Sequence, residues 1–190
     1  MDLKGSETEK NLLKAFAGES QARNRYTYFA SVAKSEGYEQ ISAIFQETAD
    51  NEKEHAKVFF KYLEGRDVEI TATYPAGKIG TTEQNLFHAA EGEHLEWGTL
   101  YPAFQQTALD EGFKEIAESF KEIAEVEEKH EKRYRKLLAN VQKDKVFTRD
   151  KVVKWKCRNC GYVHEGKFAP EKCPACSHPQ AYYELFEENY

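Results

Sequence analysis

Four acidic side chains stand near the middle of otherwise apolar helical stretches, and two of them are followed three residues later by histidine. The four glutamates are Glu19, Glu52, Glu93 and Glu127. The two histidines are His55 and His130. A carboxylate inside a helix bundle is costly unless it is paired, so four that converge need cations between them. The pattern therefore predicts a site for a pair of metal ions.

The Glu-x-x-His motif is a weak signal by itself in so acidic a chain. A third copy, Glu91 and His94, projects away from Glu93 and is interpreted as a solvated pair, and His88 as a surface residue. The other two copies lie on apolar faces at matched heights, which disfavours a surface salt-bridge helix. Two Glu-x-x-His helices and two Glu helices are typical of ferritin-like dinuclear sites. One imidazole per metal among hard carboxylates favours iron or manganese.

A fifth carboxylate, Glu96, follows Glu93 by about one helical turn and also faces inward. It is predicted to be a further metal ligand, with a hydrogen-bond acceptor beside the ligands as the alternative. Three tyrosines lie on or near the inner faces and either bond to metal-bound carboxylates or only pack. They are Tyr26, Tyr101 and Tyr134.

All four cysteines lie near the carboxyl end of the chain, in two C-x-x-C pairs separated by twelve residues. They are Cys157, Cys160, Cys173 and Cys176. This spacing predicts one tetrahedral metal site, and structural zinc and iron both fit it. Clustered C-x-x-C pairs indicate a reducing compartment rather than a disulfide framework.

The elements that position these residues are four helices, predicted over about 7–36, 39–64, 83–111 and 114–141. Capping boxes are expected at Ser6–Glu9 and Thr81–Gln84. The long connection over 66–80 predicts a crossover to the far end of the bundle, whereas the other two turns are short. The expected inner face of the third helix continues from Glu93 through Trp97, Leu100 and Phe104.

The glutamates are spaced regularly along the chain. Glu52 follows Glu19 by 33 residues, and Glu127 follows Glu93 by 34. Each pair would sit at nearly the same height in its hairpin. The sequence therefore predicts two copies of one metal-binding helical hairpin.

Length, charge and hydropathy narrow the possible classes of protein. Its 190 residues carry a net charge of −6, which argues against nucleic acid or an anionic membrane as a partner. It has neither an apolar run of transmembrane length nor a signal-like start, so a cytoplasmic location is expected. Composition changes after Val141. We predict a bundle domain over 1–145 and a small metal domain over 146–190, which is too small to fold without its ion.

Two motifs around the cysteines resemble those of rubredoxin, a one-iron electron carrier. They are Trp155-x-Cys157-x-x-Cys160-Gly161-Tyr162 and Cys173-Pro174-x-Cys176. A Glu/Glu-x-x-His bundle followed by such a knuckle resembles rubrerythrin over essentially the whole chain. The expected fold is mainly α: a ferritin-like four-helix bundle with a long crossover between its second and third helices, plus a small β-rich rubredoxin-like domain.

The resemblance implies a non-haem di-iron peroxidase that reduces hydrogen peroxide to water in oxidative stress defence. The implied di-iron ligands are Glu19, Glu52, His55, Glu93, Glu96, Glu127 and His130. Glu96 and His55 would exchange on one iron as its oxidation state changes. A third iron would sit among the four cysteines, where zinc can substitute for it.

The resemblance also implies partners. These are a rubredoxin or an NAD(P)H-linked reductase as electron donor, and a homodimer with each tetrathiolate iron near the other subunit's di-iron site. One departure is Ser177, which stands where rubredoxins usually have glycine. No firm role is assigned to His178 or His164.

Two alternatives remain open from the residues alone. One is iron oxidation and handling by a ferritin-like protein with oxygen as oxidant. The other is a metal-stabilised bundle whose zinc ribbon makes protein contacts.

Overall fold

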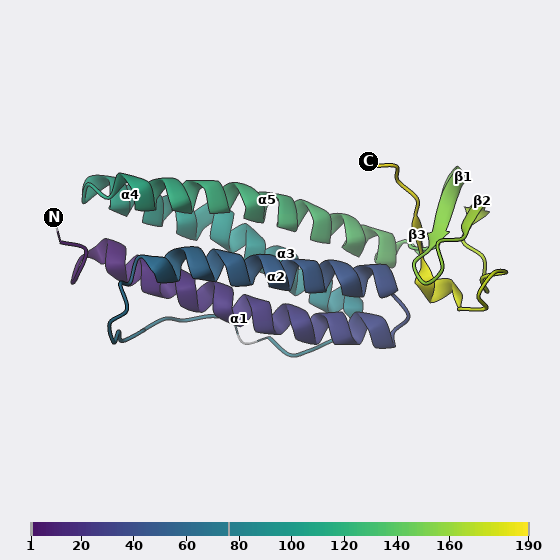
Figure 1. Ribbon diagram of the computed structural model, residues 1–190, viewed down its shortest axis with the longest axis horizontal. Coiled ribbons are helices and arrows are strands. Elements are labelled where there is room, and N and C mark those ends of the chain that lie inside the picture. Colours follow the sequence, from purple (N-terminus) through teal and green to yellow (C-terminus); the bar gives the residue numbers. More distant parts are fainter. Residues whose placement is uncertain (1, 76, 190) are drawn as a thin grey trace.

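The computed structural model describes residues 2–75 and 77–189, and in them long helices lie side by side with a small sheet at one end (Figure 1). The helices of the bundle are α1 (Glu7–Ser35), α2 (Glu39–Lys61), α3 (Thr82–Leu95), the π-helix η1 (Glu96–Leu100), α4 (Tyr101–Asp110) and α5 (Lys114–Gln142). The sheet contains β1 (Thr148–Cys157), β2 (Val163–Phe168) and β3 (Tyr183–Leu185), with a short 3-10 turn, η2 (Gln180–Tyr182). The predicted fold class is confirmed. No helix in these ranges is both long and apolar enough to cross a membrane.

Matching turns close the two helical hairpins. Gly37 and Gly112, both at φ +85°, follow the last residues of α1 and α4. In each case the next residue's N–H bonds back to a helix carbonyl, with Tyr38 N to Ala33 O at 2.8 Å and Phe113 N to Ala108 O at 2.7 Å. Glycine suits this left-handed position because it has no Cβ. The two hairpins that the sequence predicts as repeats therefore also share the same turn conformation.

The two expected capping boxes differ. At the start of α3, Thr81 Oγ1 accepts from Gln84 N at 3.3 Å, and Gln84 Oε1 accepts from Thr81 N at 3.1 Å, so the box is complete. At the start of α1, Ser6 Oγ accepts from Glu9 N, but the Glu9 carboxylate accepts from Gly5 N and pairs with Arg66. The box expected at Ser6–Glu9 is therefore only half formed, because Arg66 and Gly5 compete for the carboxylate.

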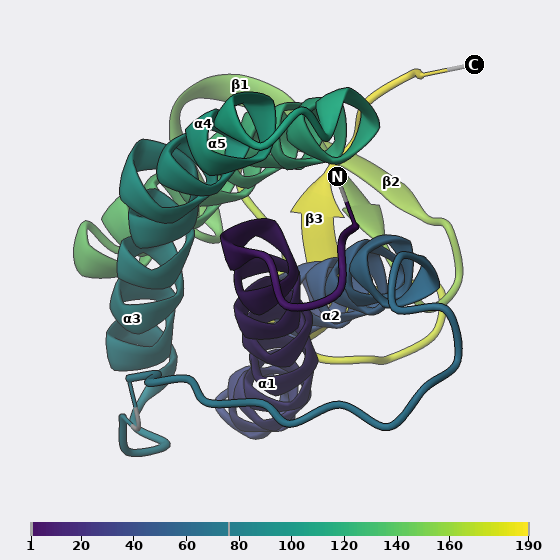
Figure 2. The same cartoon turned by 90° about the vertical axis from the view of Figure 1, so that its left-hand side faces the viewer.

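The connection between α2 and α3 runs along the outside of α1 from one end of the bundle to the other (Figures 1 and 2). It is held to α1 by the Tyr74 hydroxyl, which donates to Lys14 O, and by Arg25 Nη1, which donates to Pro75 O at 3.3 Å. The predicted crossover is confirmed, and these contacts show how an irregular segment is fastened to the bundle.

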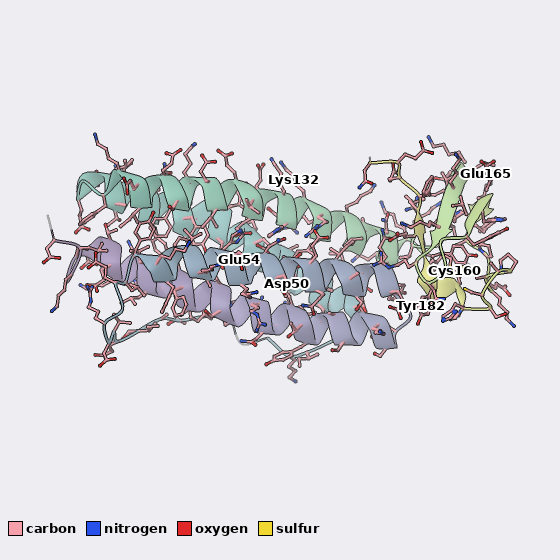
Figure 3. The ribbon with its side chains drawn as sticks, viewed as in Figure 1. Asp50, Glu54, Lys132, Cys160, Glu165 and Tyr182 are labelled. Atoms are coloured by element: carbon pink, nitrogen blue, oxygen red, sulfur yellow. The ribbon has the colours of Figure 1, made fainter. Side chains whose placement is uncertain are left out.

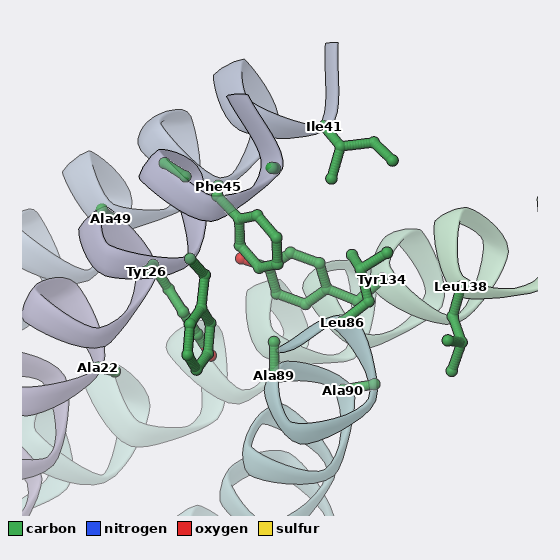
Figure 4. Packing of buried hydrophobic residues seen from close by; sticks show 13 residues of the cluster. Ala22, Tyr26, Ile41, Phe45, Ala49, Leu86, Ala89, Ala90, Tyr134 and Leu138 are labelled. Atoms are coloured by element: carbon green, nitrogen blue, oxygen red, sulfur yellow. The ribbon is translucent and has the colours of Figure 1, made fainter. Parts of the chain in front are cut away.

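Two hydrophobic clusters fill the bundle. One includes Tyr26, Phe45 and Tyr134 near the β-rich end (Figure 4), and the other includes Phe59 and Phe120 near the opposite end. Four fully buried glutamates lie between the two clusters along the helices: Glu19, Glu52, Glu93 and Glu127. Apolar packing therefore holds the helices together on both sides of a polar layer.

The helix expected over 83–111 is present as α3, η1 and α4 in direct succession, and we call these three elements the third rod. The π-helix η1 interrupts its regular α-helical geometry. In η1 the Tyr101 N–H donates to Glu96 O, five residues back, which adds one residue to the turn and shifts the inward face. Tyr101 and Ala108 are fully buried, whereas Trp97, Leu100 and Phe104, expected on the inner face, are only half-buried. The π-turn accounts for the change in phase.

The sheet has the order β2-β1-β3 with antiparallel pairing. Its small core surrounds the fully buried Trp155 and includes Cys157, Cys173 and Tyr183. Phe147, just before β1, stacks on Tyr38 with ring centroids 6.2 Å apart, which joins the sheet to the turn after α1. The predicted domain boundary between 145 and 146 falls between α5 and β1.

We expect Thr81→Ala to lower the free energy of unfolding by about 1 kcal/mol, because it removes the accepting oxygen of the complete capping box. Urea unfolding of the metal-loaded protein measures this change. Thr107→Ala, inside α4, is the control and should change stability by less than about 0.5 kcal/mol. Equal effects of the two substitutions would contradict the capping role.

Candidate metal centres

Six of the predicted residues come together between the two hydrophobic clusters, in what we call the acidic layer, and they form two overlapping groups. One group is Glu19, Glu52, His55 and Glu127, and the other is Glu52, Glu93, Glu127 and His130. Within each group the candidate ligand atoms lie within 4.8 Å of one another. Each group has one histidine and one glutamate of its own and shares two glutamates with the other.

The shared glutamates divide their oxygens between the two groups. His55 Nδ1 lies 2.8 Å from Glu127 Oε1 and 2.9 Å from Glu52 Oε2. His130 Nδ1 lies 2.7 Å from Glu127 Oε2 and 3.3 Å from Glu52 Oε1. Glu19 Oε2 is 4.0 Å from His55 Nδ1, and Glu93 Oε2 is 3.8 Å from His130 Nδ1. Two carboxylates that each face both groups can bridge two cations.

Several buried atoms in this layer lie close to other polar atoms but make no hydrogen bond of acceptable geometry within the part of the chain that the structure describes. They are Glu19 Oε2, Glu52 Oε1, Glu93 Oε2, both carboxylate oxygens of Glu127 and Nδ1 of His130. Buried polar atoms are nearly always satisfied, and acceptors aimed at one another cannot satisfy themselves. Cations satisfy all of them together, so the residues present fit a dinuclear metal centre.

Two tyrosines fix the carboxylates that are not shared. The Tyr26 hydroxyl donates to Glu93 Oε1 at 2.5 Å, and the Tyr101 hydroxyl donates to Glu19 Oε1. Each bond leaves the other oxygen of its glutamate directed at a histidine group, which is how an outer hydrogen bond orients a ligand. Tyr134 differs, since no described residue pairs with its hydroxyl and its ring packs against Phe45 at 5.1 Å.

Burial and mutual repulsion shift the pKa values of the glutamates and histidines in the acidic layer. Burial, then neighbouring carboxylates, raise the pKa of Glu93 to about 8 and that of Glu19 well above its ordinary value. Burial also opposes charge on Glu127, but His130 and His55 hold its pKa at about 2. Burial disfavours the charged histidines, yet Glu127 and Glu52 raise the pKa of His55 to about 10 and that of His130 to about 12. Positive charge within this layer is therefore strongly favoured.

Glu96 lies outside both groups, on the half-buried side of η1. A Cβ placed on Gly18 of α1 would stand 3.7 Å from Glu96 Oε1, and Tyr74 is the other neighbour there. Burial and the charges of Glu93 and Glu127 raise the pKa of Glu96 well above its ordinary value. The side chain is therefore near the acidic layer but directed toward α1, so its role as a ligand stays a prediction.

Neighbouring acidic residues show that the inward placement is selective. Asp50 and Glu54, on either side of Glu52 in α2, are exposed (Figure 3). Glu91 and His94 are also exposed, and Glu91 accepts from Arg135 Nη2 at 2.8 Å. His88 is exposed as well. Glu91, His94 and His88 are therefore exposed, as their positions on the helix predicted.

The sequence interpretation missed one buried carboxylate, Glu131, next to His130. It accepts from Trp97 Nε1 at 2.6 Å and from Arg135 Nε at 2.5 Å. The Arg135 partner was detectable, because Glu and Arg four residues apart in a helix face each other. The Trp97 partner was not, because the two residues are 34 apart in the chain and their contact depends on how the helices pack.

The four cysteines form the second candidate centre. Their sulfur atoms lie within 4.8 Å of one another, with Cys157 to Cys176 at 3.8 Å and Cys160 to Cys173 at 3.6 Å, and all four are free thiols. A tetrahedral ion with metal–sulfur bonds of about 2.3 Å requires sulfurs about 3.8 Å apart. The knuckle therefore has the geometry of a tetrathiolate site.

Two equivalent turns build this knuckle. Gly161 N donates to Cys157 O and Ser177 N to Cys173 O, both at 2.8 Å. Gly161 has φ +80° and Ser177 has φ +62°, so the serine adopts the left-handed conformation in which glycine was expected. The backbone N–H of His178 lowers the pKa of Cys176 to about 6, which favours the thiolate that binds metal.

Comparison with known proteins agrees with this pair of sites. Residues 10–138 match the family model described as Rubrerythrin, and residues 155–184 match the one described as Rubrerythrin, rubredoxin-like domain. The chain is 63% identical to the rubrerythrin of Porphyromonas gingivalis, over 99% of this chain and 94% of that protein. The chain belongs to the rubrerythrin family. It is also 57% identical to the rubrerythrin of Nitratidesulfovibrio vulgaris, over 99% of this chain and 98% of that protein.

Solved structures related to this rubrerythrin-family chain support the same architecture. Nigerythrin in its fully reduced, all-ferrous state aligns with a TM-score of 0.65 at 32% identity, over 96% of this chain and 87% of that one. A bacterioferritin from Desulfovibrio desulfuricans aligns with a TM-score of 0.64 at 22% identity, over 73% of this chain and 82% of that one. The second likeness shows the ferritin-like fold alone.

We expect Glu19→Gln to reduce the metal bound by the bundle by about one ion per chain, because it weakens only one of the two groups. In metal-free protein the same change should leave the free energy of unfolding unchanged or raise it, since it removes a buried charge. Metal analysis and urea unfolding measure the two effects. Glu54→Gln, at an exposed position of α2, should alter neither, and full metal content in the Glu19 variant would contradict the assignment.

Proposed function

We propose that the chain is a non-haem di-iron peroxidase that reduces hydrogen peroxide to water in defence against oxidative stress, with electrons supplied through a tetrathiolate iron. The observation that carries this proposal is the presence, in one chain, of two acid–histidine groups sharing Glu52 and Glu127 and of a separate four-cysteine knuckle. A storage protein has no need of an electron-carrying thiolate site, so the combination favours repeated redox turnover.

The metal ligands follow from the donor groups. We assign to the di-iron centre Glu19, Glu52, His55, Glu93, Glu127 and His130, with Glu96 as the additional ligand that exchanges with His55. We assign to the tetrathiolate iron Cys157, Cys160, Cys173 and Cys176. Carboxylate-rich donors with one imidazole per metal favour iron, and the nigerythrin structure is described as all ferrous. When bound, the two irons supply Lewis acidity and electrons for breaking the oxygen–oxygen bond.

The protein's own groups prepare this site. Tyr26 and Tyr101 hold Glu93 and Glu19 in place through their hydroxyls, so the carboxylates need no reorganisation during turnover. Glu96 lines a cavity beside the acidic layer, and burial and the charges of Glu93 and Glu127 raise the pKa of its carboxyl well above its ordinary value. We therefore assign Glu96 as the group that delivers a proton to the departing oxygen.

We also propose a homodimer in which one subunit's tetrathiolate iron lies near the other's di-iron site. Within one chain, Cys160 belongs to the β-rich domain beyond the end of the bundle, whereas the acidic layer lies at mid-length (Figure 3). This separation supports transfer between subunits. A rubredoxin or an NAD(P)H-linked reductase is the proposed external donor, and the free cysteines fit a reducing cytoplasm.

We expect the fully reduced, iron-loaded protein to react at least tenfold faster with hydrogen peroxide than with oxygen at equal concentration, as measured by stopped-flow absorbance. Metal analysis and the visible spectrum before and after mixing identify the reacting centres. A faster reaction with oxygen would favour ferritin-like iron oxidation instead. A colourless protein with zinc in the knuckle would favour a structural role.

We expect Cys160→Ser to lower steady-state peroxidase activity at least tenfold, because one thiolate of the proposed electron-supplying site is lost. A single oxidation of the pre-reduced bundle by peroxide should remain within about twofold, since the acidic layer is untouched. Glu165→Ser, at an exposed position of β2, is the control and should retain both rates (Figure 3). Undiminished steady-state activity in the cysteine variant would defeat the relay.

A further inference from the structure

A cavity of about 320 Å³ lies between α1 and the third rod, beneath residues 71–75 of the crossover. Its floor includes Glu96, Tyr26 and Tyr101, so it reaches the side chains that hold or adjoin the acidic layer. Its other walls are mainly apolar and include Ala15, Leu95, Leu100, Phe104 and Ala72. Polar side chains also line the cavity, among them Lys14, Gln21 and Arg25.

The roof of the cavity is fastened at two points. Tyr74 donates its hydroxyl to Lys14 O, and Pro75 O accepts from Arg25 Nη1 at 3.3 Å. Gly18 lies between the side chains of Tyr74 and Glu96, because a Cβ there would be in van der Waals contact with both, 3.4 Å from Tyr74 Cε1 and 3.7 Å from Glu96 Oε1.

The size and lining of the cavity exceed what hydrogen peroxide requires. An apolar protein cavity of about 150 Å³ is large enough to bind benzene, and this cavity is about 320 Å³. Pockets that bind small organic molecules have volumes in this range, mostly apolar walls and a few polar groups that set orientation. Glu96 is such a group in this cavity.

We propose that the cavity binds the organic part of an alkyl or aryl hydroperoxide, with its O–O group at Glu96. The inference rests on the proposed peroxidase function and adds a substrate class to it. The reaction is ROOH + 2 electrons + 2 protons → ROH + H₂O. The O–O bond breaks, each oxygen gains an O–H bond, and the electrons come from the reduced metal sites of the protein. Leu95 and Leu100 contact the R group, while Glu96 faces the oxygens.

The first test measures kcat/KM of the iron-loaded protein for cumene hydroperoxide and for hydrogen peroxide. We expect the two values to agree within about tenfold. Reduction of hydrogen peroxide without reduction of cumene hydroperoxide would overturn this inference and leave the proposed function standing. Reduction of neither would overturn both.

The second test uses a matched pair of exposed leucines. Leu95, 43% exposed, lines the cavity, whereas Leu109, 45% exposed, is on α4 and does not. We expect Leu95→Trp to narrow the cavity and lower the ratio of kcat/KM for cumene hydroperoxide to that for hydrogen peroxide at least tenfold. Leu109→Trp should leave the ratio within about twofold. An unchanged ratio in the Leu95 variant would contradict the proposed binding site.

A binding measurement separates recognition from turnover. The zinc-loaded full chain, which is redox-silent, is titrated with 2-phenyl-2-propanol, the alcohol product, and followed by amide NMR. We expect saturable shifts at residues 71–75, Leu95 and Leu100, with at least tenfold weaker binding in Leu95→Trp. Shifts absent from these residues, or equally strong binding in the variant, would overturn the inference.

Discussion

The structure depends on the burial of carboxylates that face one another across the bundle. Glu52 on α2 and Glu127 on α5 each direct one oxygen toward His55 and the other toward His130. Such an arrangement repels itself unless positive charge lies between the oxygens. Hydrophobic clusters on both sides of the layer oppose this repulsion by holding the helices together. Packing and charge thus act against each other at mid-length, as expected of a site built to retain cations.

Hydrogen bonds between the two hairpins make this layer a single unit. Tyr26 on α1 donates to Glu93 on α3, and Tyr101 on α4 donates to Glu19 on α1. Each hairpin therefore orients a carboxylate of the other, which follows from the approximate repeat of the chain. The arrangement explains why buried tyrosines, rather than phenylalanines of similar size, occupy these two positions.

The π-turn breaks the repeat on one side of the layer. At its start, Glu96 lies near Gly18 and Tyr74, and Trp97 Nε1 donates to Glu131. The same side carries the cavity roofed by the crossover, whereas α2 and α5, which contact each other, do not line it. An irregular turn at a functional site is common for π-helices. Here it supplies Glu96 and Leu100 to the lining of the cavity.

The sequence alone determined the donor types, their helical phase and their heights. Within each helix the apolar face repeats every 3.6 residues and includes the glutamate, and the spacings of 33 and 34 residues place the two glutamates of each hairpin at similar heights. The metal-binding knuckle was equally predictable from the spacing of its four cysteines. Only the tertiary structure decided the position of Glu96, the burial of Glu131 and the path along α1 of the segment that contains Tyr74. One extra residue in a turn changes which later residues of that helix face inward. The path of an irregular segment depends on contacts with residues distant in the chain. Neither effect is encoded in local periodicity.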